Sequence, residues 1–375
     1  MTKSTREKPD HDADHAPQAS AEKPQPAEGR RDLLLEVRDL KTYFMLDEGT
    51  VRAVDGVSYD LRRGQTLGVV GESGCGKSVT GQSILRIVPK PGKIVSGEMM
   101  YHRRRRGTGN DGGSQAVETL VDLARLDPFG KEIRSIRGNE IAMIFQEPMA
   151  SLSPVHTIGH QIGEVIELHQ GAGKKQARAA AIEMLARVGL PKAQEVIDRY
   201  PHQLSGGMRQ RAVIAMALCC RPSLLIADEP TTALDVTTEA QILELMKELQ
   251  SEFGMAIQYI THNLSVIAEM ADDVVVMYLG KQVELATVVD LFLHPSHPYS
   301  KALLRSIPRV GRKSRQRLES ISGMVPDPYS IPSGCAFHPR CPYYMPGVCD
   351  NPTFIQVGAN HWVRCSRAAE LEALR

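Results

Sequence analysis

The residues with the clearest chemistry form a glycine-rich run, Gly71-Glu72-Ser73-Gly74-Cys75-Gly76-Lys77-Ser78, which fits the pattern GxxxxGK followed by Ser or Thr. A strand-like apolar segment, LGVV, precedes this run, and a helical pattern, SVTGQSILRIV, follows it. Glycines let successive backbone N–H groups curl around phosphate oxygens at the start of a helix. Lys77 would then neutralise the β and γ oxygens, and the Ser78 hydroxyl would ligate Mg²⁺. The run therefore predicts a nucleotide site.

A pair of carboxylates, Asp228 and Glu229, ends the apolar segment SLLIADEP. The carboxyl ends of strands in a parallel sheet open into the ligand crevice, so both acids would face a bound nucleotide. Asp228 would hold Mg²⁺ through its water shell, while Glu229 would orient or deprotonate the attacking water. Alone, such a pair often only caps the exit of a strand into a turn. Beside a phosphate loop it indicates phosphoryl transfer.

The segment LSGGMRQ places Ser205, Gly206 and Gly207 at the start of an apolar helix that contains AVIAMALCC. Free N–H groups at a helix N-terminus make an anion site. A serine that simply caps the helix is the usual alternative for such a segment. The presence of the other two motifs in the same chain favours the anion site.

The elements that must position these residues follow from hydrophobic periodicity. Residues 33–71 contain short alternating segments, LLLEVRDLKTYF, VRAVDGVSYDL and QTLGVVG, which predict strands joined by turns at Glu48-Gly49 and Arg63-Gly64. Residues 154–200 have a mostly helical pattern. From Ser223 the pattern becomes strand, helix over 238–253 and strand, with Gly254 placed to end the helix. This alternation predicts a mostly parallel α/β sheet.

Two polar segments interrupt these patterns. Residues 1–31 are rich in Pro, Ala, Glu, Lys, Asp and His without apolar periodicity, which predicts a disordered tail. Residues 103–113, which contain Arg103–Arg106 and then GTGNDGG, predict an exposed loop insertion. The alternative of a nucleic-acid patch lacks interleaved aromatic residues. The sequence assigns no role to either segment.

Composition excludes several classes of protein. The 375 residues include 45 Lys and Arg against 44 Asp and Glu, and a net charge of +1 argues against a polyelectrolyte that binds nucleic acid. The longest apolar run, residues 212–220, is far short of the roughly 20 residues that cross a bilayer. No apolar stretch follows the first Met, so a secretory signal is not predicted and a reducing cytosol is expected.

With GESGCGKS, LSGGMRQ and LLIADEP in that order, residues 33–282 resemble the nucleotide-binding subunit of ATP-binding cassette (ABC) transporters. The resemblance implies an α/β fold of the P-loop ABC ATPase type, with an antiparallel β subdomain, a RecA-like parallel-sheet core and a helical subdomain at about 147–205. It places the nucleotide-binding domain at 32–282 and a small Cys-containing C-terminal extension at 283–375. It also implies that ATP and Mg²⁺ bind.

The same resemblance implies the roles of further residues. Gln146 in IFQEP would be the Q-loop residue that senses Mg²⁺ and the membrane partner, and His262 in YITHN would contact the γ-phosphate. Together with Glu229 they form the implied catalytic set. The implied nucleotide-binding set is Tyr43 (stacked on adenine), Gly71, Glu72, Ser73, Gly74, Cys75, Gly76, Lys77, Ser78, Asp228, Ser205, Gly206, Gly207 and Asp235, and the implied Mg²⁺ set is Ser78, Gln146 and Asp228. Two subunits would clamp ATP between the phosphate loop of one and the LSGG segment of the other.

Further segments resemble the peptide and nickel import branch: SLSP with TIG after the Q-loop, and His297-Pro298-Tyr299 followed by KALL. This implies an ATPase that energises an importer of short peptides or a related small solute. Its implied partners are a second ATPase subunit, identical or sister, two transmembrane permease subunits and, indirectly, an extracytoplasmic solute-binding protein. The subunit would be peripheral, on the cytoplasmic face of the inner membrane. The alternative is an ABC ATPase of DNA repair or translation, which the single cassette and the balanced charge disfavour.

Four cysteines, Cys335, Cys341, Cys349 and Cys365, lie within a Pro-rich segment that has little apolar content to fold around. Four thiolates can hold zinc or an iron–sulfur cluster, and the spacing lacks the tight pairs of zinc ribbons. The resemblance to peptide importers favours a 4Fe-4S cluster over Zn²⁺, with unligated thiols as the third alternative and His338 and His361 as substitute ligands. A structural staple is favoured over a redox sensor that gates the ATPase.

Cys75 lies inside the phosphate loop. A helix N-terminus and the nearby Lys77 would lower the pKa of its thiol. We therefore expect Cys75 to be sensitive to alkylation and protected by ATP. Cys219 and Cys220, on an apolar helix, are expected in the core.

Overall fold

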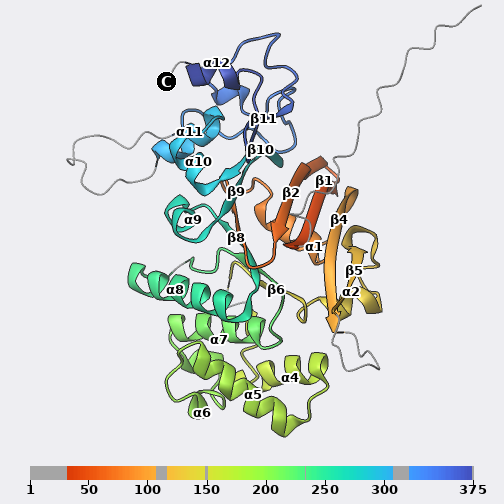
Figure 1. Cartoon of the computed structure of the whole chain (residues 1–375), viewed down its shortest axis with the longest axis vertical. Helices are drawn as coiled ribbons and strands as arrows, with labels where there is room; N and C mark the ends of the chain where they lie inside the picture. Colours follow the sequence, from red (N-terminus) through yellow and green to blue (C-terminus); the bar gives the residue numbers. More distant parts are fainter. Residues whose placement is uncertain (1–31, 107–115, 148–150, 233, 307–320, 374–375) are drawn as a thin grey trace, which may run out of the picture. The chain divides into compact units, whose positions relative to one another are not determined.

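Two β-sheets organise the part of the chain that the structure describes (Figure 1). The computed structural model describes residues 32–106, 116–147, 151–232, 234–306 and 321–373. The predicted tail at 1–31 and the glycine-rich part of the predicted insertion, 107–113, lie outside these residues. The strands are β1 Leu33–Leu46, β2 Gly49–Arg62, β3 Thr66–Val70, β4 Gly92–Arg106, β5 Ala116–Asp122, β6 Ile141–Ile144, β7 Leu224–Asp228, β8 Ala256–Thr261, β9 Asp273–Tyr278, β10 Lys281–Thr287, β11 Phe354–Gly358 and β12 His361–Arg364.

The smaller sheet is antiparallel and has the strand order β2-β1-β4-β5. β1 and β2 are the strands expected from the alternating segments, and a turn at residues 47–48 joins them. Residues 63–64 form the second expected turn, which leads into β3. The alternating apolar side chains of β1 and β2 bury one face of this sheet, as period-2 patterns require.

The larger sheet has the order β11-β12-β10-β9-β3-β8-β7-β6, and its core strands β9, β3, β8, β7 and β6 run parallel. Every residue of β3, β7 and β8 is buried, because a parallel sheet is covered on both faces. Successive residues of β7 contribute to two different apolar cores: Leu224 and Ile226 pack with α1 and the small sheet, and Leu225 and Ala227 pack with the other helices. The predicted α/β fold is confirmed.

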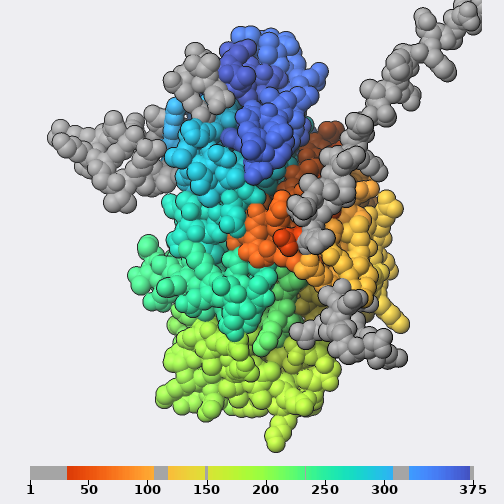
Figure 2. Space-filling model, in the orientation of Figure 1, coloured from red at the N-terminus to blue at the C-terminus, as the bar shows by residue number. Residues whose placement is uncertain are grey.

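The C-terminal strands extend this sheet with antiparallel pairs. β10 pairs antiparallel with β9, and β12 pairs antiparallel with both β10 and β11. The residues after 281 therefore continue the sheet that contains the phosphate-loop strand. Figure 2 shows residues 321–373, in blue, directly against the cyan residues that carry β10 and the helices after it.

The helices are α1 Lys77–Ile84, α2 Lys131–Ile136, α4 Ile158–Gln170, α5 Lys174–Arg187, α6 Ala193–Val196, α7 Gly206–Leu218, α8 Val236–Phe253, α9 Leu264–Met270, α10 Val288–Leu293, α11 Pro298–Arg305 and α12 Ala368–Ala373, with 3-10 turns η2 Leu123–Arg125, η3 Pro201–Gln203 and η4 His338–Arg340. α4, α5 and α6 occupy the segment expected to be helical, and they group with α7 in Figure 1. Gly254 ends α8 as expected, with φ of 64°. Among the described residues, no helix combines the length and apolar character that crossing a membrane requires.

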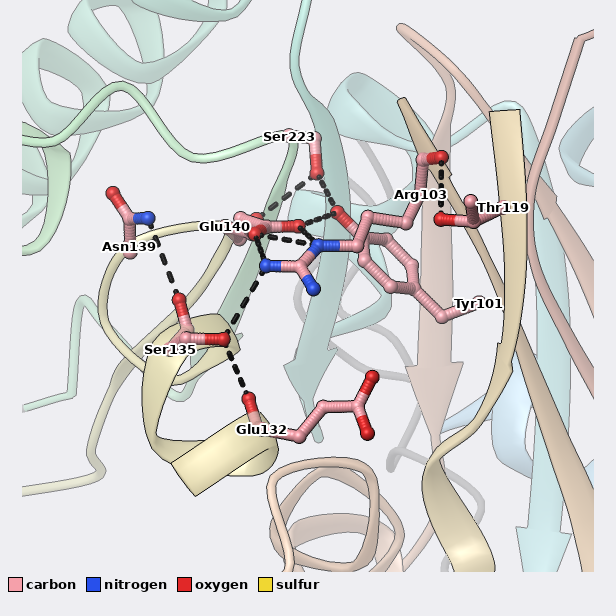
Figure 3. Close-up of polar contacts among 8 residues, drawn as sticks. All are labelled: Tyr101, Arg103, Thr119, Glu132, Ser135, Asn139, Glu140 and Ser223. Atoms are coloured by element: carbon pink, nitrogen blue, oxygen red, sulfur yellow. Dashed lines mark hydrogen bonds and ion pairs between the residues drawn. The ribbon is translucent and has the colours of Figure 1, made fainter. Parts of the chain in front are cut away.

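The predicted loop at residues 103–113 is wrong for its first four residues, because Arg103–Arg106 form the end of β4. Arg103 is buried, and its Nε donates to both carboxylate oxygens of Glu140 at 2.8 Å while its Nη2 pairs with the same group. Figure 3 shows this guanidinium pointing from the strand at Glu140. A run of arginines is typical of a solvated loop in the sequence, yet Arg103 can be buried in the strand because its charge is paired with the partly buried Glu140.

The Arg103–Glu140 pair belongs to a network that ties the two sheets together. Tyr101 of β4 donates its hydroxyl to Glu140 at 3.2 Å and lies 2.8 Å from the Ser223 hydroxyl (Figure 3). Glu140 precedes β6, and Ser223 precedes β7. The network therefore fixes the small sheet relative to the strand that ends in the two site carboxylates.

This network yields a stability prediction. We expect Arg103→Ala to lower the free energy of unfolding by about 3 kcal/mol, because it leaves the Glu140 carboxylate without its buried counter-ion. Arg104→Ala is the matched control: its side chain is 40% exposed and 3.7 Å from Glu118, so the loss should stay below about 1 kcal/mol. Urea unfolding of both variants measures the difference. Equal losses would contradict a specific role for the buried pair.

Candidate nucleotide site

The phosphate loop runs from the buried strand β3 to the first residue of α1. Gly71 and Gly76 have φ of 155° and 99°. A Cβ at Gly76 would lie 1.9 Å from the Ala53 carbonyl oxygen, and one at Gly71 would lie 2.2 Å from the Met277 carbonyl oxygen. Only glycine fits at these two positions, where the loop touches the backbones of β2 and β9.

The side chains of Lys77 and Ser78 connect the phosphate loop to its own backbone and to the end of β7. Lys77 is buried, and its Nζ donates to the carbonyl oxygens of Gly71 and Glu72 at 2.9 and 3.2 Å. The Ser78 hydroxyl donates to Asp228 Oδ1 at 2.9 Å. The loop and the end of β7 thus meet, so a cationic group, a hydroxyl and a carboxylate converge on one position suited to a metal-bound phosphate.

Glu229 has an unusual backbone and a set of convergent partners. Its φ of 47° is left-handed, a strained conformation for a residue other than glycine, and such strain is found at functional sites. Its carboxylate is 3.0 Å from His262 Nδ1 and accepts a hydrogen bond from Gln146 Nε2 at 3.2 Å. The Thr232 hydroxyl donates to it at 3.1 Å. The structure therefore brings the implied catalytic set together around one carboxylate.

The two neighbouring carboxyls have different electrostatics. Burial raises the pKa of Asp228 to about 6, although the Ser78 hydrogen bond acts in the opposite direction. Burial also favours the neutral form of Glu229, but the hydrogen bond and charge of His262 and the Thr232 hydrogen bond outweigh it and lower the pKa of Glu229. Glu229 is therefore ionised at neutral pH and can accept a proton or orient a water molecule.

Ser205, Gly206 and Gly207 lie on the helical group, apart from the P-loop helix α1 in the fold. The Ser205 hydroxyl caps α7 by accepting from Met208 N at 3.3 Å. Ser205 and Gly206 are exposed, and a Cβ at Gly206 would meet no atom within 4 Å. The N-terminus of α7 is open to an outside partner, and within this chain the serine acts as the ordinary cap.

Tyr43 and Asp235 have local partners in the structure. The Tyr43 hydroxyl donates to Asp55 Oδ1 at 2.8 Å, and the Arg52 guanidinium lies 5.8 Å from the centre of its ring. Asp235 caps α8 by accepting from Thr238 N at 3.0 Å.

The expectation for Cys75 is wrong. Its side chain is buried, and this burial raises the pKa of the thiol although the charge of Lys77 acts in the opposite direction. The Cys75 carbonyl oxygen accepts from Gly280 N at 3.0 Å, so the residue packs inward on the β9–β10 turn. The structure therefore removes the basis for alkylation sensitivity. Of the two expected core cysteines, Cys219 is buried and Cys220 is half-buried.

The four C-terminal cysteines lie around one small cavity of about 20 Å³. Cys365 is buried, and Cys335, Cys341 and Cys349 are half-buried. Burial raises the pKa of Cys341 to about 11. In the part of the chain that the structure describes, no three His, Cys, Asp or Glu side chains are arranged to hold a single metal ion.

Three partners of the site were not identified from the sequence. Thr232 binds Glu229, while Tyr299 and Arg340 bind Glu72 of the phosphate loop. Tyr299 belongs to the HPY segment that supported the resemblance to importers. Arg340 lies 268 residues from Glu72, and no local pattern connects the two.

Comparison with known proteins agrees with this geometry. Residues 54–232 match the family model described as ABC transporter, and residues 283–349 match the oligopeptide/dipeptide transporter C-terminal region. A probable peptide ABC transporter ATP-binding protein of Sinorhizobium fredii is 46% identical over 91% of this chain and 97% of its own length. The oligopeptide transport ATP-binding protein AppD of Bacillus subtilis is 48% identical over 88% of this chain and 96% of its own length.

A solved structure with the same fold is the ATP-binding cassette MJ0796, described as a dimer in a post-hydrolysis state bound to ADP and Pi. The similarity has a TM-score of 0.57 and 25% identity, and covers 68% of this chain and 99% of that one. The phosphate loop, the carboxylate pair and the C-terminal region all fall within the matched families. The chain belongs to the ATP-binding proteins of the ABC transporter family, in its oligopeptide and dipeptide transporter branch.

Proposed function

We propose that this ABC ATPase powers the uptake of short peptides, acting on the cytoplasmic face of a membrane as a peripheral subunit of an importer. The observation that best supports ATP hydrolysis at this site is the convergence of Gln146 and His262 on Glu229, next to the Ser78–Asp228 pair. The peptide class is supported by the relatives, which are peptide-transport proteins. The same relatives favour the transporter over the alternative in DNA repair or translation.

The phosphate loop and its neighbours account for nucleotide binding. The N–H groups of residues 71–78 and the Lys77 ammonium would bind the β and γ phosphates. Ser78, Asp228 and Gln146 would hold Mg²⁺, which neutralises charge on the phosphate oxygens. Hydroxyl, carboxylate and amide oxygens are the hard donors that this ion prefers, so the residues present fit it.

Glu229 would act as the general base. Its ionised carboxylate can take a proton from water while Gln146 and His262 hold it in one orientation. The left-handed backbone at Glu229 turns this side chain from the strand toward both partners. The His262 side chain is 59% exposed, so it can also reach a γ-phosphate in front of the carboxylate.

A second cassette would complete the site. The exposed Ser205 and Gly206 at the start of α7 face away from their own chain, as an anion site offered to a partner would. The dimeric state of the similar cassette MJ0796 supports this arrangement. ATP would hold two cassettes together and hydrolysis would release them, driving two permease subunits that receive peptide from an extracytoplasmic binding protein. An identical chain and a sister chain are both suitable as the second cassette.

The domain limits proposed from the sequence accompany this function. We assign residues 32–282, with the helical subdomain at about 147–205, to the cassette and residues 283–375 to the extension. The matches at 54–232 and 283–349 support this division.

We expect Glu229→Gln to retain ATP but to lower kcat by about 10²–10⁴-fold, because the amide cannot accept the proton. Glu248→Gln, on the exposed face of α8, is the matched control and should hydrolyse ATP at the normal rate. ATP turnover and nucleotide retention by the purified chain measure both effects. Uptake of a labelled tripeptide by cells carrying each variant tests whether ATP hydrolysis is coupled to transport.

Unchanged ATP turnover in Glu229→Gln would show that this residue is not the base. Normal peptide uptake by cells whose variant cannot hydrolyse ATP would refute the transport role.

We also propose that Cys335, Cys341, Cys349 and Cys365 hold a 4Fe-4S cluster. The support is their position around one cavity in a segment with little apolar core of its own. The spacing of the four cysteines along the sequence lacks the tight pairs of zinc ribbons, which favours the cluster over Zn²⁺. Such a cluster would stabilise the segment by joining its four cysteines. This structural role requires no electron transfer.

We expect the chain purified without oxygen to contain about four irons, since four thiolates are available for one cluster. Cys349→Ser should lose most of this iron, while Cys220→Ser, the half-buried control outside the cavity, should keep it. Metal analysis with visible absorption measures both. Zinc in place of iron, or no metal in either protein, would contradict the cluster.

A further inference from the structure

The phosphate loop is held from outside by a residue of the C-terminal extension. Arg340 forms a bidentate ion pair with Glu72, the second residue of the loop: Nη1 donates to Oε2 at 2.7 Å and Nη2 donates to Oε1 at 3.1 Å. Two parallel hydrogen bonds between a guanidinium and a carboxylate fix direction as well as distance. The extension therefore determines where the Glu72 side chain points.

The guanidinium of Arg340 cannot easily move. Its side chain is only 3% exposed, its Nε donates to the Ser322 carbonyl oxygen at 3.1 Å, and Nη1 also donates to the Tyr278 hydroxyl at 3.3 Å. The rings of Tyr278 and Phe337 each lie with centres 5.9 Å from its central carbon. Hydrogen bonds and aromatic faces thus hold the cation on several sides.

A second residue of the extension binds the backbone of the same loop position. The Tyr299 hydroxyl accepts a hydrogen bond from Glu72 N at 2.9 Å. Tyr299 is fully buried, and its ring packs against Tyr278 and Phe337 at centre distances of 4.7 and 5.4 Å. Arg340 therefore binds the side chain of Glu72 and Tyr299 binds its backbone N–H, and both residues pack in one aromatic cluster outside the loop.

Glu72 in turn positions the groups that meet phosphate. Its carbonyl oxygen accepts from Lys77 Nζ at 3.2 Å and from Cys75 N at 3.3 Å. Its carboxylate is the only acidic side chain in the loop run 71–78, where a triphosphate carries several negative charges. An unpaired carboxylate there would repel the nucleotide, and the Arg340 charge cancels it.

We propose that Arg340 is a positioning residue for ATP binding, which acts through Glu72 to neutralise the loop carboxylate and to fix the loop in its phosphate-binding shape. Arg340 lies in η4, directly before Cys341, so the segment that contains the four cysteines also supplies the residue that binds Glu72. The contact joins the two parts of the chain that match separate family models. The proposal rests on ATP binding at the loop and does not depend on the role of Glu229 or on the occupant of the cysteine cavity.

The test is a double-mutant cycle read out as the Kd for a fluorescent ATP analogue and as kcat and KM for ATP. Arg340→Gln leaves the Glu72 carboxylate unpaired, so we expect Kd and KM to rise at least about tenfold, with kcat changed less than about threefold. Glu72→Gln alone should raise Kd less than Arg340→Gln does, because it breaks the pair but leaves no charge to repel phosphate. In the double variant, Kd should fall from the Arg340→Gln value to that of Glu72→Gln alone. Arg340→Lys should give a Kd between those of the natural chain and Arg340→Gln, since lysine keeps the positive charge but cannot form two parallel hydrogen bonds with the carboxylate.

Two further variants separate positioning from folding. Arg364→Gln is the matched control: its Nε binds the Gln282 carbonyl oxygen in the same extension, away from the loop, and it should leave the Kd for ATP unchanged. Tyr299→Phe keeps the aromatic cluster and removes only the acceptor for Glu72 N, so it should raise Kd by about threefold even if Arg340→Gln does not fold.

Three outcomes would overturn the proposal: an unchanged Kd in Arg340→Gln, an equal rise of Kd in Arg364→Gln, or no lowering of Kd when Glu72→Gln is added to Arg340→Gln. If Arg340→Gln does not fold, an unchanged Kd in Tyr299→Phe would overturn the proposal. Because binding is measured without hydrolysis, a failure of Glu229 as the base would not affect the result.

Discussion

The close packing of the phosphate loop against the backbones of β2 and β9 is the constraint on which the site depends. Gly71 and Gly76 leave no room for a Cβ, because carbonyl oxygens of the two strands would lie within 2.2 Å of it. One strand from each sheet therefore determines the curve of the loop. This curve directs the Lys77 ammonium into the loop and begins α1 where its free N–H groups can meet phosphate.

The second feature of the site is the contrast between two adjacent carboxyls. Asp228 ends a fully buried strand beside Ser78, whereas the left-handed backbone at Glu229 turns the next side chain toward His262 and Gln146. Burial raises the pKa of Asp228, whereas at Glu229 the effect of burial is outweighed by the hydrogen bonds of His262 and Thr232 together with the charge of His262, so that its pKa is lowered. A single change of backbone direction thus gives the neighbouring acids different environments and opposite pKa shifts.

The extension is more than an addition at the edge of the sheet. β12 continues the sheet through β10, and the Arg340–Glu72 pair connects the cysteine segment to the loop itself. Buried ion pairs contribute little net stability compared with apolar packing, because both charges lose their hydration. Such a pair is therefore better explained by the orientation it imposes than by the stability it adds.

Features whose signals are local could be predicted from the chain alone: the phosphate loop, the carboxylates at the end of a strand, and the helix that ends at Gly254. Their patterns depend on neighbouring residues, which the chain order fixes. The burial of Arg103 in a strand could not be predicted in this way, because its partner Glu140 lies 37 residues away and meets it only in the folded protein. The tertiary structure also reversed the direction of the Cys75 pKa shift, since burial by distant segments outweighs the nearby lysine. The Arg340–Glu72 contact depends on the same fact: burial and charge pairing are properties of residues that meet only after folding.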